Sequence, residues 1–137
     1  MAPSRAERQR RDVVDAVRDS LRPGEQVLAV LPFASTPKRP KGPDGKVRTG
    51  LYQSARRYRP LVVTDRRLLV VEAVRTPYPR GLLEEFPVAA VRVVDVEPTR
   101  FGHRLSLELP RHGVVPFELG RFDLIELDEF EAALGPS

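Results

Sequence analysis

The most informative pattern of apolar and polar residues lies near the middle of the chain. Residues 61–63 and 68–71 are runs of Leu and Val, and the four residues between them, Thr64 to Arg67, are polar and suited to a tight turn. Two short apolar runs joined in this way are typical of antiparallel strands. The pattern therefore predicts a β-hairpin, with strands near 57–64 and 66–74.

Further strands are expected on both sides of this hairpin. Residues 26–33 are mostly apolar at odd and at even positions, as in a strand that is covered on both faces. Four shorter strand patterns follow, at 82–86, 91–97, 105–109 and 115–119. The apolar phase shifts within 91–97, which predicts a β-bulge, and Pro116 favours an edge or bulged position for the last strand.

A helix is predicted at the start of the chain, over residues 4–20. Ser4 and Glu7 have the spacing of a capping box, in which each side chain bonds the backbone of the other residue. The helix carries one narrow apolar stripe, formed by Val13, Val14, Val17 and Leu21. A narrow stripe is suited to packing against the outside or the open end of a sheet.

A second amphipathic helix is predicted at the other end of the chain. Leu127, Phe130 and Leu134 recur at helical spacing after Gly120. Asp123 and Glu126 are available to cap and charge its first turn. We expect this helix to cap the sheet.

Length and composition are those of a single domain. A chain of 137 residues can bury a sizeable core without a disulfide or a structural metal. It contains no cysteine, so thiol catalysis, thiolate metal sites and disulfides are excluded. No apolar run reaches the roughly 18 residues that a membrane-spanning helix requires. We expect a cytoplasmic protein, peripheral to the membrane if it docks there. Residues 34–50, rich in Pro and Gly, are predicted to form a long basic loop.

About seven strands followed by one helix resemble the pleckstrin-homology-like superfold, especially its bacterial and GRAM-like members. The resemblance rests on Pro23-Gly24-Glu25-Gln26-Val27-Leu28, which is similar to the family's lead into its first strand, and on Leu61-Val62-Val63-Thr64-Asp65-Arg66-Arg67-Leu68, which resembles its second hairpin. It implies a mainly β antiparallel barrel over residues 21–134, capped by the C-terminal helix, with the N-terminal helix of residues 1–20 as an addition. The superfold hosts many tasks and does not specify one.

Signatures of catalysis are missing from the sequence. It has no nucleophile elbow, no phosphate-binding Gly loop before a Lys, and no His-Glu-x-x-His helix. His103 and His112 lie near opposite ends of a predicted hairpin and could face each other across it, but two histidines without a placed carboxylate are more often polar turn residues than ligands. The acidic pairs Glu84-Glu85 and Asp128-Glu129 are interpreted as solvated charge. We therefore expect no enzyme, no cofactor and no metal site.

Charge is distributed unevenly along the chain. Residues 1–67 contain 16 basic and 7 acidic side chains, whereas residues 68–137 contain 7 and 12. The densest basic stretch, residues 37–67, carries a balance of +8. Basic residues held together on one rim attract anionic partners, and arginine can bind phosphate oxygens through two parallel hydrogen bonds.

The basic stretch provides the candidate binding residues. In the family that the chain resembles, phosphoinositide-binding members place basic residues in the first-strand loop and along the second strand, and the resemblance assigns Lys38, Arg39 and Lys41 to that loop. Arg57 and Arg59 lie two residues apart, which places them on one side of a strand. Arg66, together with Arg56 and Arg67, would widen the patch. The alternative interpretation is an ordinary solvated face of an arginine-rich chain.

Three functions remain open at this point. The first is a noncatalytic adaptor whose basic rim docks on an anionic membrane surface or lipid headgroup. The second is a protein-interaction or self-assembly module, because the two halves of the chain have opposite charge. The third is nucleic-acid binding, which ranks lowest because only Tyr52 and Tyr58 could stack on bases within the basic segment.

Overall fold

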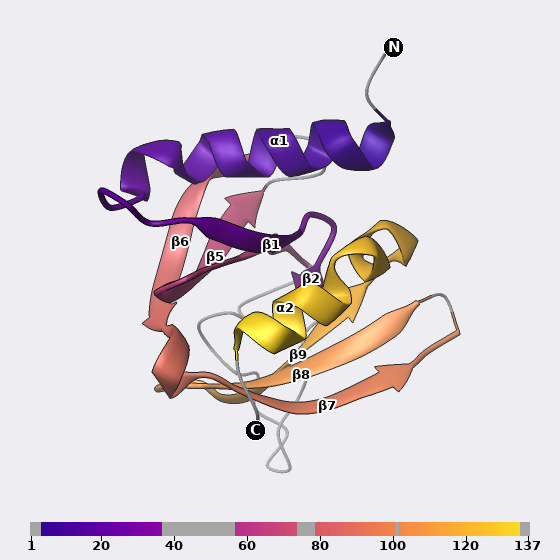
Figure 1. The fold of residues 1–137 in the computed structure, drawn as a ribbon. Helices are drawn as coiled ribbons and strands as arrows, with labels where there is room; N and C mark the ends of the chain where they lie inside the picture. Colours follow the sequence, from indigo (N-terminus) through magenta and orange to yellow (C-terminus); the bar gives the residue numbers. More distant parts are fainter. Residues whose placement is uncertain (1–3, 37–56, 74–78, 101, 135–137) are drawn as a thin grey trace.

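Two helices and nine strands make up a mainly β structure in the computed structural model of the protein, which describes residues 4–36, 57–73, 79–100 and 102–134 (Figure 1). In chain order the helices and strands are α1 (Arg5–Val17), β1 (Val27–Leu31), β2 (Ser35–Thr36), β3 (Arg57–Tyr58), β4 (Leu61–Thr64), β5 (Arg67–Ala73), β6 (Pro79–Pro87), β7 (Arg92–Pro98), β8 (His103–Leu109), β9 (Gly113–Leu119) and α2 (Leu127–Ala133). Three short 3-10 helices follow α1, β6 and β9, at Arg18–Ser20, Val88–Ala90 and Arg121–Ile125. Neither α1 nor α2 has the length and apolar character that crossing a membrane requires.

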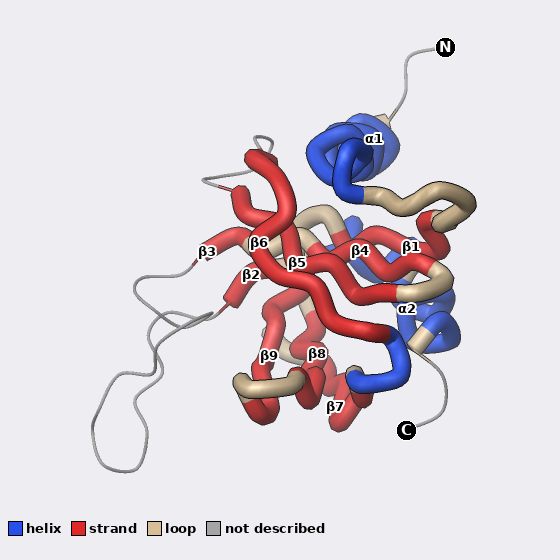
Figure 2. The backbone as a smooth tube through the Cα atoms, turned by 90° about the vertical axis from the view of Figure 1, so that its left-hand side faces the viewer, coloured by secondary structure: helices blue, strands red, loops and turns tan. Residues whose placement is uncertain are grey.

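The strands form two antiparallel layers (Figure 2). One layer contains β1, β4, β5 and β6, and the other contains β2, β9, β8 and β7. Strand β3 joins the layers, since it pairs with β2 on one side and with β5 on the other. Within the described residues β7 pairs only with β8, so this edge stays open and the sheet is not a closed barrel.

The core explains why the central strands are apolar at both parities. Alternate residues of β4 and β5 point in opposite directions, as the pleat of a strand requires. Leu61 and Leu68 face the space between the two layers, where they pack with residues of β8, β9 and α2. Val62 and Leu69 face outward and pack under Val13 and the rest of the α1 stripe. Helix α1 therefore covers the outer face of the first layer, as the narrow stripe predicted.

The free edge of β1 is covered by the segment that leads into α2. Asp123 Oδ1 accepts a hydrogen bond of 2.7 Å from the Phe33 backbone N–H, and Glu126 Oε1 accepts one of 3.3 Å from the Val30 backbone N–H. Two carboxylates thus occupy positions that another strand would take at an unprotected edge. Glu126 also receives Arg10 Nε of α1 at 2.9 Å, so one carboxylate connects α1, β1 and α2.

Most of the predicted elements are confirmed. The hairpin forms between β4 and β5, the bulge lies between Val93 and Asp95, and Ser4 caps α1 by accepting the Glu7 backbone N–H at 3.1 Å. Strand β9 pairs with β2 only at Glu118, so Pro116 lies where the outer side of the strand has no partner, as its missing N–H favours.

Four predictions about local structure are wrong. The predicted loop over residues 34–50 begins too early, because Ser35–Thr36 form β2 and pair with β3. Strand β6 is longer than the predicted 82–86, because it pairs with β5 along its whole length. The predicted strand 57–64 is divided at Arg59 and Pro60, since Pro60 has no N–H to donate and the N–H of Arg59 bonds the Ala34 carbonyl instead. Glu126 does not cap α2, because its carboxylate is directed at β1.

Candidate functional site

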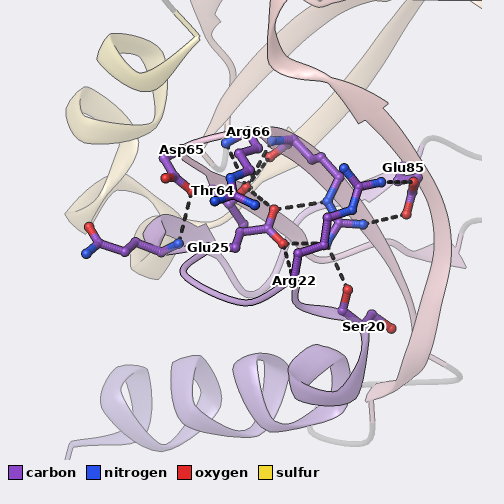
Figure 3. A network of polar contacts seen from close by, with 9 residues as sticks. Ser20, Arg22, Glu25, Thr64, Asp65, Arg66 and Glu85 are labelled. Carbon is purple, nitrogen blue, oxygen red and sulfur yellow. Dashed lines mark hydrogen bonds and ion pairs between the residues drawn. The ribbon is translucent and has the colours of Figure 1, made fainter.

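Arg67, at the start of β5, is bound by Ser20, Glu25 and Glu85, which belong to the polar network of Figure 3. Its side chain is only 6% exposed and donates four hydrogen bonds. Nε and Nη2 bind the two carboxylate oxygens of Glu25 at 2.9 and 2.5 Å, Nη1 binds Glu85 Oε2 at 2.6 Å, and Nη2 also reaches the Ser20 carbonyl at 2.8 Å. Such a paired geometry is the strongest that a guanidinium makes with a carboxylate.

Glu25 is the centre of the same network. Its side chain has no exposed surface, and it also accepts hydrogen bonds from Thr64 Oγ1 at 2.6 Å and from the Arg22 backbone N–H at 2.9 Å. The pKa of Glu25 is lowered from 4.5 to about 2, chiefly because Arg67 donates to the carboxylate. Four of the five N–H groups of the guanidinium therefore already have partners within the chain.

The turn between β4 and β5 is fastened to the start of β1 by its own side chains. Thr64 Oγ1 accepts the backbone N–H groups of Arg66 and Arg67 at 3.1 and 2.9 Å. Asp65 Oδ1 accepts the Gln26 backbone N–H at 3.0 Å, while the Asp65 backbone N–H donates to the Gln26 carbonyl. The side chains of Thr64, Asp65 and Arg67 therefore hold the β4–β5 turn against the start of β1.

Two arginines of the basic stretch are buried, which corrects the predicted patch. Arg67 is used within the network. Arg59 is 9% exposed and donates from Nη1 to the Tyr58 carbonyl at 3.1 Å, at the break between β3 and β4. Neither side chain can belong to an exposed anion-binding rim.

The other predicted site residues are not brought together in the described part of the protein. Lys38, Arg39 and Lys41, with Arg56, lie outside the described residues. For Arg57 only the backbone is described, in β3 opposite Thr36. Arg66 is exposed, but it lies in the β4–β5 turn beside Gly24, at the far end of the hairpin from β3.

One geometric feature of the basic segment is nevertheless clear. Strands β2 and β3 pair antiparallel, with Ser35 opposite Tyr58 and Thr36 opposite Arg57. The chain therefore leaves for residues 37–56 and returns from them at adjacent positions of one hairpin. That segment contains six basic residues and one acidic residue.

Sequence reasoning missed a second cluster, which we call the corner patch. It combines cationic, aromatic and exposed apolar side chains from three segments, and its members are Arg5, Phe33, Arg121, Phe122, Leu124 and Ile125. The rings of Phe33 and Phe122 lie 5.5 Å apart. The Arg5 guanidinium lies 5.7 Å from the Phe33 ring centre, and that of Arg121 lies 4.8 Å from the Phe122 ring centre. Its parts are up to 120 positions apart in the sequence, so no spacing pattern could have predicted it.

The corner patch is held by the carboxylate of Asp123. Oδ1 accepts the Phe33 backbone N–H and Oδ2 accepts the Gly120 backbone N–H, at 2.7 and 2.8 Å, and the residue is fully buried. Burial raises the pKa of Asp123 from 3.8 to about 6. The next two residues, Leu124 and Ile125, remain 36% and 63% exposed.

The histidines do not form a site. His103 lies opposite Leu119 at one end of the β8–β9 hairpin, whereas His112 lies in the turn at the other end. They do not face each other, because the length of the hairpin separates them. His112 Nε2 instead lies 3.0 Å from Glu84 Oε2 on β6, and its ring packs edge-on against Phe86.

The two acidic pairs differ in whether their side chains have partners within the protein. Solvated charge is the wrong interpretation for Glu84, which is partly buried against His112. Glu85 is 43% exposed, as that interpretation expects, but it also binds Arg67. The interpretation is confirmed for Asp128 and Glu129, which are exposed on α2. Within the described ranges no three histidine or acidic side chains gather as metal ligands would.

Comparisons with known proteins assign no family. No protein-family model matches the chain, and no curated protein matches it.

Proposed function

We propose that this protein is a noncatalytic docking module with a pleckstrin-homology-like arrangement, which binds anionic membrane surfaces through the basic segment between β2 and β3. The strand order supports the resemblance. If β1 with β2 and β3 with β4 are counted as two bent strands, seven strands precede α2, and residues 37–56 take the place of the first-strand loop. The pairing of Thr36 with Arg57 is the observation that carries the proposal.

The binding residues follow from what remains available. Arg59 and Arg67 are excluded because they are buried, and Arg66 because it lies at the other end of the hairpin. Lys38, Arg39, Lys41 and Arg57 are adjacent in sequence to the two paired strand ends. Each basic residue close to an anionic leaflet contributes about 1 kcal/mol, so three or four give useful binding that salt weakens.

The test is co-flotation with vesicles made from equal amounts of phosphatidylglycerol and phosphatidylcholine. We expect the wild type to float with these vesicles at low salt and to be released at high salt. Lys38→Gln, Arg39→Gln and Lys41→Gln combined should weaken binding roughly hundredfold, because three charges are lost at the contact.

The matched control removes the same number of charges elsewhere. Arg18, Arg92 and Arg111 are exposed on three other elements, and their combined Gln variant has the same net charge. We expect it to bind nearly as well as the wild type. No flotation of the folded wild type, or equal losses in the two triple variants, would overturn the proposal. In the second case net charge alone would explain the binding.

A further inference from the structure

We propose that the corner patch is the part of the protein that enters the lipid interface, with Leu124 and Ile125 among the acyl chains and Arg5 and Arg121 at the phosphates. This inference rests on the proposed function and names the side chains that make its apolar contact. The three segments of the corner patch meet at the right-hand side of Figure 1, where the N-terminal end of α1, the turn after β1 and the segment before α2 come together.

The composition of the patch is that of a membrane interface. Ile125 is 63% exposed, the largest value among the exposed large apolar residues described, and Leu124 is beside it in sequence. Phe33 and Phe122 are partly buried. Aromatic rings and apolar tips flanked by cations are the composition that lies at the boundary between headgroups and acyl chains.

The two arginines remain available to phosphates while they touch the rings. Both residues are exposed, and each lies near a ring at 4.8 to 5.7 Å, which leaves the rest of the guanidinium open to solvent. Arg5 also lines a cleft of about 200 Å³ on α1, together with Arg8, Gln9, Arg11 and one acidic residue, Asp12. The cationic side of the corner patch thus extends along the first turns of α1.

The corner patch also lies close to the start of the basic segment. Phe33 precedes Thr36, the last residue of β2, by three residues, and three residues span at most about 11 Å. The apolar contact and the basic contact are therefore on neighbouring parts of the protein.

The exposed acidic residues of α2 determine which side of the protein faces the membrane. Asp128 and Glu129 are exposed and begin three residues after Ile125. An anionic surface repels them, so the α2 side is expected to turn away while the Arg5 side approaches. Glu126 does not add to this repulsion to the same extent, because its carboxylate is directed inward to Val30 and paired with Arg10.

The absence of tryptophan from the chain allows a direct test. Ile125→Trp places a single tryptophan at the corner patch, and Val94→Trp places one at another exposed site, on β7, where Val94 is 47% exposed. With the vesicles described above, we expect the emission of Ile125→Trp to shift to the blue and to be quenched by lipids brominated in the acyl chains. The emission of Val94→Trp should not change.

Binding measurements on serine variants provide the second readout. Leu124→Ser with Ile125→Ser should weaken vesicle binding on the order of tenfold, because two apolar side chains lose their burial in lipid. Val94→Ser should leave binding unchanged. Thermal unfolding of each variant shows that it is folded, as expected for substitutions at exposed positions.

The outcomes separate this inference from the proposed function. If the protein floats with vesicles but Ile125→Trp shows neither shift nor quenching, the corner patch does not enter the interface and the proposed function stands. If the folded protein does not float at all, both are overturned. If the emission of Ile125→Trp shifts on raising protein concentration without vesicles, the corner patch is a self-association surface and the inference is wrong.

Discussion

The guanidinium of Arg67 and the carboxylate of Glu25 meet through two hydrogen bonds, of 2.5 and 2.9 Å, across 42 positions of sequence. Both side chains are almost completely removed from solvent. The pair joins the turn before β1 to the β4–β5 hairpin, and it assigns Arg67 a role in the fold.

Removal of this carboxylate should destabilise the protein strongly. Glu25→Gln leaves a buried guanidinium without its main partner, and we expect a loss of about 3 kcal/mol in the free energy of unfolding, measured by urea denaturation. Glu85→Gln is the control, because Glu85 binds the same guanidinium but is 43% exposed, and it should cost less than about 1 kcal/mol. Similar losses in the two variants would contradict this ranking.

The same pair predicts sensitivity to acid. The folded protein lowers the pKa of Glu25 from 4.5 to about 2, mainly through the hydrogen bond from Arg67. The stabilisation is therefore present in full above pH 4.5 and is lost as the pH falls to about 2. The difference in stability between the wild type and Glu25→Gln should shrink over this range in denaturation experiments. A constant difference would argue against ionised Glu25 as its source.

Asp123 should have the opposite pH dependence. Burial raises its pKa from 3.8 to about 6, so its contribution is fully present below pH 3.8 and is lost as the pH rises through about 6. In Asp123→Asn this titration is removed. We expect the stability of the wild type relative to this variant to fall between these two pH values and to stay constant above them. A difference that rises with pH would show that the hydrogen bonds from Phe33 and Gly120 outweigh burial.

Helix α2 is expected to contribute to stability through one large side chain. Phe130 is fully buried between the layers, and Phe130→Ala should cost about 3–5 kcal/mol because it removes a ring from a packed core. Glu129→Ala, at the adjacent exposed position, should change stability by less than about 0.5 kcal/mol. Urea denaturation monitored by circular dichroism measures both. A small loss for Phe130→Ala would mean that α2 is not an integral part of the core.

Local sequence patterns were sufficient to predict the elements that are determined by residues close to one another in the sequence. The two-sided apolar runs of β4 and β5, the bulge near Val94 and the capped start of α1 could all be predicted, because periodicity and turn chemistry act over a few residues. The break between β3 and β4 could also have been predicted, because Pro60 has no N–H for strand pairing.

The candidate site shows where sequence reasoning ends. Counting arginines could not distinguish Arg67 and Arg59, which are buried, from Arg66, which is exposed, since burial depends on what the rest of the chain packs against them.

The sequence by itself determined the mainly β character, the two helices, the antiparallel hairpins and the placement of six basic residues between 37 and 56. Only the tertiary structure decided that Glu25 neutralises Arg67, that Asp123 and Glu126 cover the β1 edge, and that Arg5, Phe33 and Phe122 share one corner. The physical reason is distance along the chain: short-range periodicity fixes which face of an element is apolar, whereas these contacts join residues about 30 to 120 positions apart, and they exist only after the layers have packed.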